Sequence, residues 1–225
     1  MTKNVFPNDL TTRIKTAGIV AVLTIDDAQD AVPLARALLD GGVDCIELTL
    51  RTPVAIDALK RIKAEVPQIM AGVGTILTTA QVAEVVAAGA AFGVAPGMNP
   101  RVAQAAQQAG LPFAPGVLTP SDIEQALENG CRLLKFFPAE PAGGLSYLKS
   151  MAAPYAHLNP LFIPFGGLEA LHLESYLNEP IIAAVGGSWI ASRDLIRKRD
   201  WQRVTDNARQ AAEIVRRIRK GDKNQ

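Results

Sequence analysis

Arg132-Leu133-Leu134-Lys135-Phe136-Phe137-Pro138 places one lysine inside an apolar run that ends at a proline. Short apolar runs of this kind are typical of buried strands in parallel sheets. A lysine in such a run loses hydration, which favours the neutral amine, and a neutral amine is a nucleophile. The alternative is an edge strand whose lysine faces solvent. Alternation along the strand puts Leu133, Lys135 and Phe137 on one face, so we expect the amine to share a pocket with Phe137.

The unit around this run recurs along the chain: a short β-rich run, a turn, an amphipathic stretch and a glycine. Strands are predicted wherever β-branched and aromatic residues cluster between turn signals. The eight predicted strands are Ile19–Leu23, Cys45–Thr49, Met70–Val73, Phe92–Ala95, Pro112–Ala114, Leu133–Phe137, Leu161–Pro164 and Ile181–Val185.

Helix boundaries are predicted between these strands from capping residues. Side-chain oxygens before a helical run favour N-caps, and glycines after one favour left-handed C-caps. The predicted N-caps are Thr52, Asn99 and Thr119, and the predicted C-caps are Gly41, Gly89, Gly110 and Gly130. Pro33 fits a helix only in the first turn, which makes Asp30 the expected cap there. A one-sided helix is predicted over residues 201–218, and a short extra helix over Asn8 to Thr16.

Eight alternating strand and helix units predict a closed (β/α)₈ TIM barrel rather than an open doubly wound sheet. Thr24-Ile25-Asp26-Asp27 follows the first strand, where a dinucleotide-binding sheet has a glycine-rich fingerprint. We expect a single domain over residues 1–225. Within it, residues 1–17 would form an N-terminal extension with its helix, and residues 220–225 a frayed tail.

Composition and net charge limit the classes of molecule that we expect this protein to bind. The chain has 225 residues, 48% of them hydrophobic, with Lys+Arg 23 against Asp+Glu 22. A net charge near zero gives no global attraction to nucleic acid or to a membrane, and we expect neither as a partner. Arginines on the last helix are interpreted as a solvated face. Cys45 and Cys131, both assigned to predicted strands, are expected to be buried and reduced, which with the absence of an N-terminal signal favours the cytoplasm.

In a barrel, chemistry sits at the C-terminal ends of the strands. The second strand ends in Glu47, Thr49 and Arg51, which alternation puts on one face. That pattern points a carboxylate and a guanidinium inward. A structural ion pair between Glu47 and Arg51 is the alternative interpretation.

Glycines mark the ends of several other strands. Gly72-Val73-Gly74-Thr75 would let a ligand approach the backbone and a hydroxyl. Gly166-Gly167 and Gly186-Gly187-Ser188 fall in the last two loops, where barrels commonly hold phosphate. Taken singly these are ordinary turns. Together with Lys135, Glu47 and Arg51 they indicate Schiff-base chemistry on an anionic sugar acid.

Four segments, in this order and spacing, carry a closer likeness: 47–52 (ELTLRT), 72–75 (GVGT), 135–140 (KFFPAE) and 186–189 (GGSW). They resemble the 2-dehydro-3-deoxy-6-phosphogluconate aldolase family, also described as 4-hydroxy-2-oxoglutarate aldolases. The resemblance implies a class I aldolase of carbohydrate metabolism on a (β/α)₈ barrel. It further implies a homotrimer that works without metal or cofactor, through a covalent imine.

The resemblance also implies roles by position. Lys135 corresponds to the Schiff-base lysine and Glu47 to the acid/base, while Arg51 and Thr75 correspond to the pair that holds the pyruvyl carboxylate. The remaining substrate-binding positions are Pro96 and Phe137 as pocket walls, and Gly166, Gly167, Gly186, Gly187 and Ser188 at the phosphate end. Phe165 stands where the family commonly has threonine. A bulky ring thus replaces a hydroxyl, and this replacement bears on the length of the substrate.

The implied reaction is cleavage of a 2-keto-3-deoxy sugar acid. The first substrate is 2-dehydro-3-deoxy-6-phosphogluconate, giving pyruvate and glyceraldehyde 3-phosphate; a second is 4-hydroxy-2-oxoglutarate, giving pyruvate and glyoxylate. Two alternatives remain open. One is a phosphate-binding barrel epimerase or isomerase, although His157 and His172 lie away from predicted strand ends. The other is a catalytically idle sugar-phosphate binder, which only Phe165 favours.

Overall fold

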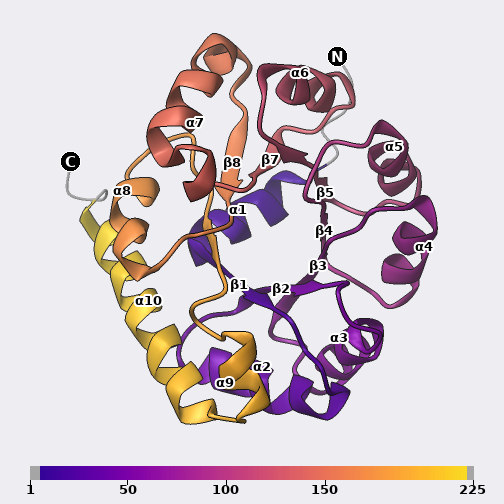
Figure 1. Ribbon diagram of the computed structural model, residues 1–225, viewed down its shortest axis with the longest axis vertical. Helices are drawn as coiled ribbons and strands as arrows, with labels where there is room; N and C mark the ends of the chain where they lie inside the picture. The colour runs from indigo at the N-terminus through magenta and orange to yellow at the C-terminus, as the bar shows by residue number, and fades with distance from the viewer. Residues whose placement is uncertain (1–5, 222–225) are drawn as a thin grey trace.

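A computed structural model of the protein, which describes residues 6–221, shows an α/β fold in which helices surround parallel strands (Figure 1). The strands form two sheets, one of six strands in the order β5-β4-β3-β2-β1-β9 and one of three in the order β6-β7-β8. The strands are β1 (Ile19–Leu23), β2 (Cys45–Thr49), β3 (Met70–Gly74), β4 (Gly93–Val94), β5 (Phe113–Ala114), β6 (Gly116–Val117), β7 (Leu133–Phe136), β8 (Leu161–Pro164) and β9 (Val185–Gly187).

The two sheets curl toward each other. Isolated parallel bridges join Phe162 to Ile182 and Phe165 to Gly186, and so connect β8 with the segment that carries β9. At the other junction, β5 and β6 lie on either side of Pro115, which has no N–H to donate to a ladder. The predicted fifth strand therefore continues beyond Ala114 as β6.

The predicted strands agree closely with the structure, and the last one differs most. That strand runs over Val185–Gly187 instead of the predicted Ile181–Val185. Ile182 donates its N–H to the Glu179 carbonyl in a turn, at 3.0 Å, so it makes only an isolated bridge to the sheet. The apolar run from which this strand was predicted therefore included residues that belong to the preceding turn.

The helices and their caps follow most of the predicted signals. Asn99 and Thr119 accept hydrogen bonds from the backbone N–H groups of Arg101 and Asp122 and cap their helices as predicted. The prediction for Thr52 is wrong, because its hydroxyl donates to the Ile25 carbonyl. The helices are α1 (Asn8–Ala17), α2 (Ala31–Asp40), α3 (Ala55–Glu65), α4 (Thr79–Ala87), α5 (Pro100–Gln108), α6 (Pro120–Glu128), α7 (Gly144–Ala152), α8 (Leu173–Leu177), α9 (Arg193–Arg197) and α10 (Trp201–Gly221).

Pro33 lies in the first turn of α2, as expected, and Asp30 occupies the N-cap position. The Asp30 carboxylate makes no capping hydrogen bond, because it accepts one from Arg199 Nε at 2.7 Å. Asp27 is the side chain that caps at this point, by accepting from the Gln29 N–H.

Three of the four glycines predicted as left-handed C-caps, Gly89, Gly110 and Gly130, have positive φ angles. Gly41 does not: its φ is −83°, and Gly42 takes the left-handed conformation instead. The reason for glycine at position 41 is space. A Cβ there would lie 2.4 Å from the Ala208 Cβ and 2.6 Å from the Thr205 carbonyl oxygen, both on α10.

Apolar side chains pack in two layers, outside and inside the curled strands. The outer layer joins strands to helices and includes Leu134 and Phe136 of β7 and Val204 of α10. The inner layer includes Leu133 of β7 and Ile14 of α1. Helix α1 lies behind the strands in the middle of the ring of helices (Figure 1), where its apolar face closes one end of the curl, as predicted for residues 8–16.

Helix α10 buries one face against the sheet side, as predicted, and most of its arginines lie on the exposed face. It remains helical through Gly221. Residues 1–5 and 222–225, which belong to the predicted extension and tail, lie outside the described residues.

Both cysteines are buried free thiols, as expected. Cys45 begins β2, whereas Cys131 precedes β7 and is not in a strand, contrary to the prediction. Burial raises the pKa of Cys45, and it raises the pKa of Cys131 to about 12. Within residues 6–221, no helix is long and apolar enough to cross a membrane. The same residues contain no group of three or more His, Cys, Asp or Glu side chains arranged to hold a metal ion.

The fit of α2 against α10 at Gly41 can be tested by mutation. Gly41→Ala should lower the free energy of unfolding by about 1–3 kcal/mol, because the added methyl group overpacks this contact. Gly97→Ala is the matched control, since its Cβ would meet nothing within 4 Å. Urea unfolding measures both variants, and equal midpoints would contradict the close approach of the two helices.

Candidate active site

A cavity of about 370 Å³ opens at the C-terminal ends of the strands. The twelve residues predicted for the site all line it, and they come from six separate strand ends. They are Glu47, Arg51, Thr75, Pro96, Lys135, Phe137, Phe165, Gly166, Gly167, Gly186, Gly187 and Ser188. The fold therefore brings together what the sequence spreads over more than half of the chain.

Lys135 points into this cavity. It is only 6% exposed, and its Nζ lies 3.1 and 3.2 Å from the two carboxylate oxygens of Glu47, which is itself fully buried. The register pairs Lys135 with Gly116 of β6 on one side, which presents no side chain, and with Ile163 of β8 on the other. The face predicted from alternation is confirmed, and the solvent-facing alternative is wrong.

Two aromatic rings flank the amine. Lys135 Nζ lies 4.1 Å from the centroid of the Phe165 ring and 5.6 Å from that of Phe137. Cations within about 6 Å of a ring face are attracted by its quadrupole. The Lys135 side chain is thus held between a carboxylate and an aromatic face, which fixes the direction of its nitrogen.

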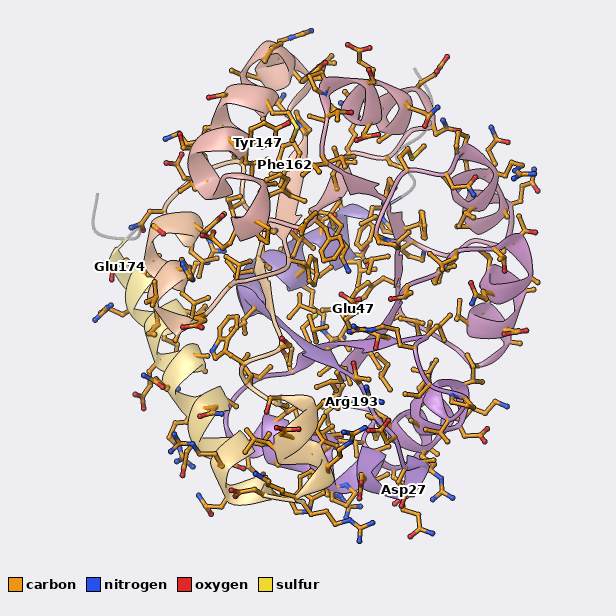
Figure 2. All side chains as sticks on the ribbon, viewed as in Figure 1. Asp27, Glu47, Tyr147, Phe162, Glu174 and Arg193 are labelled. Atoms are coloured by element: carbon orange, nitrogen blue, oxygen red, sulfur yellow. The ribbon has the colours of Figure 1, made fainter. Side chains whose placement is uncertain are left out.

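The Glu47 side chain passes over the end of β3 on its way to Lys135, and a glycine of β3 leaves space for the carboxylate. A Cβ on Gly74 would lie 1.6 Å from Glu47 Oε1, so any other residue there would displace the carboxylate. Figure 2 shows Glu47 near the middle of the ring of helices. The alternative of a structural pair between Glu47 and Arg51 is excluded, because the carboxylate pairs with Lys135.

Arg51 and Thr75 follow β2 and β3 at the mouth. Arg51 is exposed, and among the described residues it has neither an ion pair nor a side-chain hydrogen bond, so its guanidinium can bind a ligand. Thr75 has a φ of 63°, a left-handed conformation that is rare for a β-branched residue. Such outliers cluster at functional sites, where the surroundings enforce them.

Gly186 and Gly187, which lie in β9 and not in the predicted loop, serve the neighbouring rings as well as the cavity. A Cβ on Gly186 would lie 2.0 Å from the Phe165 ring, and one on Gly187 would lie 1.5 Å from the Trp189 ring. Phe165 therefore occupies the space that Gly186 leaves open. Ser188, just beyond, is exposed and lines the mouth.

Three lining residues were not predicted for the site: Val22, Thr49 and Leu168. Thr49 lies on the same alternating face of the strand as Glu47 and Arg51, and this position was the sequence signal that could have identified it as a site residue. Its hydroxyl donates to the Leu23 carbonyl at 3.0 Å and so ties β2 to β1 beside the cavity. Val22 and Leu168 are apolar, and no chemical signal distinguishes them from core residues.

Glu140, at the end of the 135–140 segment, serves the scaffold. Its carboxylate accepts a hydrogen bond from the Tyr176 hydroxyl at 2.6 Å, and burial together with this carboxylate raises the pKa of Tyr176. Its backbone N–H donates to the Gly166 carbonyl at 3.1 Å. The segment that carries Lys135 is thereby joined to the loop that carries Phe165.

Comparison with known proteins agrees with this geometry. The family model described as "Aldolase: KDPG and KHG aldolase" matches residues 10–207. The 2-dehydro-3-deoxy-phosphogluconate aldolase of Treponema pallidum is 41% identical over 88% of this chain and 93% of that protein. The KHG/KDPG aldolase of Escherichia coli is 38% identical over 89% of this chain and 93% of its own length.

Solved structures agree as well. The KDPG aldolase of Legionella pneumophila, described with pyruvate captured as a covalent carbinolamine intermediate, superimposes with a TM-score of 0.85. It is 37% identical, over 89% of this chain and 97% of that chain. The Zymomonas mobilis enzyme with 3-phosphoglycerate gives a TM-score of 0.83 at 38% identity, over 91% and 94% of the two chains. This chain therefore belongs to the KDPG and KHG aldolase family and is a lyase.

Proposed function

We propose that this protein is a class I aldolase that cleaves 2-dehydro-3-deoxy-6-phosphogluconate to pyruvate and glyceraldehyde 3-phosphate, with Lys135 as the Schiff-base residue. The single observation that carries the proposal is the buried contact of Lys135 Nζ with both oxygens of Glu47. A buried amine beside a buried carboxylate can exchange a proton without solvent. That exchange leaves a neutral nucleophile and a protonated acid next to each other.

The reaction begins when Glu47 accepts a proton from Lys135 and the free amine attacks the C2 ketone of the substrate. Loss of water, assisted by the same carboxyl group, gives a protonated imine that acts as an electron sink. No external cofactor is required, because the imine itself withdraws the electrons. Arg51 and Thr75 hold the substrate carboxylate at the mouth, which places C2 within reach of the nitrogen.

Cleavage then uses Glu47 a second time. The carboxylate, directly or through one water, takes the proton of the C4 hydroxyl; the C3–C4 bond breaks, the aldehyde leaves and an enamine remains on Lys135. Glu47 returns the proton to C3, and hydrolysis of the imine releases pyruvate. Pro96 and Phe137 form the walls that keep the reacting carbons in line. Ser188, the loop at Gly166–Gly167 and the end of β9 at Gly186–Gly187 face the far end of the substrate.

Phe165 bears on the length of that substrate. Its ring fills space beside Gly186, lies 4.1 Å from Lys135 Nζ and offers no hydrogen bond, so it narrows the cavity beside the reactive amine. A shorter keto acid such as 4-hydroxy-2-oxoglutarate, which yields pyruvate and glyoxylate, is therefore a second substrate of the same site.

We also infer the setting of this chemistry. The bridges from Phe162 to Ile182 and from Phe165 to Gly186 support one closed (β/α)₈ barrel, which works as a single domain. The family likeness implies a homotrimer that acts in the cytoplasm on small anionic keto acids. The near-neutral charge fits the expectation that neither nucleic acid nor a membrane is a partner. The alternatives, an epimerase or isomerase and an idle binder, are not favoured, since His157 and His172 do not line the cavity whereas a lysine does.

The Schiff base can be trapped. Incubation with pyruvate and borohydride should place a reduced pyruvyl adduct on the peptide that contains Lys135, as measured by mass spectrometry of a tryptic digest. Lys149→Ala serves as the control, because Lys149 lies on the surface and pairs with Glu179. An adduct that is absent, or that sits on another lysine, would remove Lys135 from the proposed role.

Glu47→Gln tests the acid/base role. The amide keeps an oxygen near Lys135 but cannot take up protons, so turnover should fall by about 10²–10⁴-fold while some adduct still forms. Steady-state pyruvate release gives the rate, and circular dichroism confirms that the variant is folded. Turnover equal to that of the unchanged protein would show that another group moves the proton.

Phe165→Thr and Phe165→Val test the substrate range as a pair of equal shape. Both enlarge the cavity beside the reactive amine, and only the threonine adds a hydroxyl. We expect kcat/KM for the six-carbon phosphorylated substrate to rise relative to that for 4-hydroxy-2-oxoglutarate, and to rise further with threonine. If neither variant changes this ratio of kcat/KM values, Phe165 does not limit substrate length.

A further inference from the structure

Threonine side chains join the backbone at the end of β1 to the backbone at the end of β2, two strands that lie side by side (Figure 1). The Thr49 hydroxyl donates to the Leu23 carbonyl at 3.0 Å, and the Thr52 hydroxyl donates to the Ile25 carbonyl at 2.6 Å. The hydroxyl oxygens of Thr24 and Thr49 lie 3.1 Å apart. Because the one hydroxyl proton of Thr49 goes to Leu23, Thr24 is the donor in this contact. These three hydrogen bonds form a link that we call the threonine bracket.

The bracket continues the connection between the two strands where their parallel ladder ends. The last paired residues of β1 and β2 are Leu23 and Leu48. On the side of β3, the Leu50 N–H donates to the Gly74 carbonyl at 2.9 Å. Arg51 follows directly, so its backbone is held from the β3 side by this bond and from the β1 side by the bracket.

The β1 side of the bracket is itself anchored. The Asp26 carboxylate, next to Ile25, accepts hydrogen bonds from Arg193 and Arg197 of α9. The Ile25 side chain is buried in the outer apolar layer. The backbone that follows β1 is therefore a firm support for the bracket.

The Arg51 side chain depends on its backbone for direction. Among the described residues, its guanidinium has neither an ion pair nor a side-chain hydrogen bond, and it is exposed at the mouth. Bidentate binding of a carboxylate by a guanidinium requires a defined geometry, and a displacement of about 1 Å can cost much of the activity. The bracket thus sets the direction from which Arg51 meets a ligand.

Within the bracket, Thr52 differs from Thr49 because it does not line the cavity. We propose that Thr52 is a positioning residue, whose bond to the Ile25 carbonyl aims Arg51 at the carboxylate of the bound keto acid. This role makes the site selective for 2-keto acids over neutral ketones. The inference rests on the proposed function and extends it by a residue outside the cavity.

Thr52→Val tests this role, because valine keeps the shape of the side chain and removes the hydroxyl. The reduced adduct on the Lys135 peptide is measured against pyruvate concentration in the presence of borohydride. We expect the half-saturating pyruvate concentration to rise about five-fold or more, since the carboxylate loses part of a charge-assisted contact. KM for the cleaved substrate should rise similarly at constant kcat, as when binding is lost equally in the ground and transition states. Thr52→Ser keeps the hydroxyl and should restore both values.

Acetone separates the aim of Arg51 from damage to the amine, because it is a ketone without a carboxylate. Its adduct on Lys135 should form equally in Thr52→Val and in the unchanged protein. Arg51→Gln should itself raise the half-saturating pyruvate concentration. Adding Thr52→Val to Arg51→Gln should have no further effect, because both changes act on one contact.

Thr205→Val is the matched control. It removes a bond of the same kind, from the Thr205 hydroxyl to the Ala37 carbonyl at 2.9 Å, which joins α10 to α2. Neither residue lines the cavity, so the pyruvate dependence should stay unchanged. Thr52→Ala is measured alongside as a second variant without the hydroxyl, and circular dichroism confirms that each protein is folded.

Three results would overturn the positioning role. They are an unchanged half-saturating pyruvate concentration in both hydroxyl-free variants of Thr52, an equal loss of the acetone adduct, and a further rise when Thr52→Val is added to Arg51→Gln. Each of them leaves the pyruvate adduct of the unchanged protein intact and so refutes this inference alone. Absence of that adduct from the unchanged protein would instead refute the proposed function.

Discussion

The buried pair of Lys135 and Glu47 is the interaction on which the rest of the site depends. Removing two charges from water costs several kcal/mol for each ion, and their mutual attraction only partly offsets this cost. The pair is therefore better understood as a reactive centre than as a source of stability. Its surroundings serve to keep it dry and aligned: Gly74 leaves space for the carboxylate, and the Phe165 ring lies over the ammonium group.

The curl of the strands explains how such a pair can exist. Inward-facing positions at the start of the strands are apolar, as with Cys45 and Leu133, and together with α1 they seal one end. The next inward positions on the same two strands are Glu47 and Lys135. The inward-facing positions two residues further along each strand lie at the mouth of the cavity. Along the inward face of each strand, apolar core residues thus give way to reactive side chains within five residues, because every second residue points to the same face.

Two features shape the surroundings of the reactive pair and of the cavity mouth. The Phe165 ring and Gly186 are mutually dependent, since any side chain at position 186 would collide with the ring. At the outer end of the cavity, Asp26 joins the β1 loop to α9 through Arg193 and Arg197. The Phe165 ring lies 4.1 Å from Lys135 Nζ and so adjoins the reactive pair, whereas Asp26, Arg193 and Arg197 do not line the main cavity.

Much of the fold could be predicted from local signals, because strands, caps and C-terminal glycines depend on residues close in sequence. Asn99 and Thr119 cap helices whose donors lie two and three residues away. The failures involve distant partners. Gly41 is required by α10, more than 160 residues later, and Thr52 is drawn to the Ile25 carbonyl instead of its own helix.

The sequence by itself determined which residues could react: a lysine in an apolar strand, a carboxylate two residues from the end of another, and glycines at the strand ends. Alternation also determined the face on which Lys135 lies. Only the tertiary structure decided that Glu47 pairs with Lys135 rather than with Arg51, and that Gly74 and Gly186 make room for the side chains of Glu47 and Phe165. These contacts join residues 88, 27 and 21 positions apart. Their distances follow from how the strands curl and pack, which no local pattern specifies.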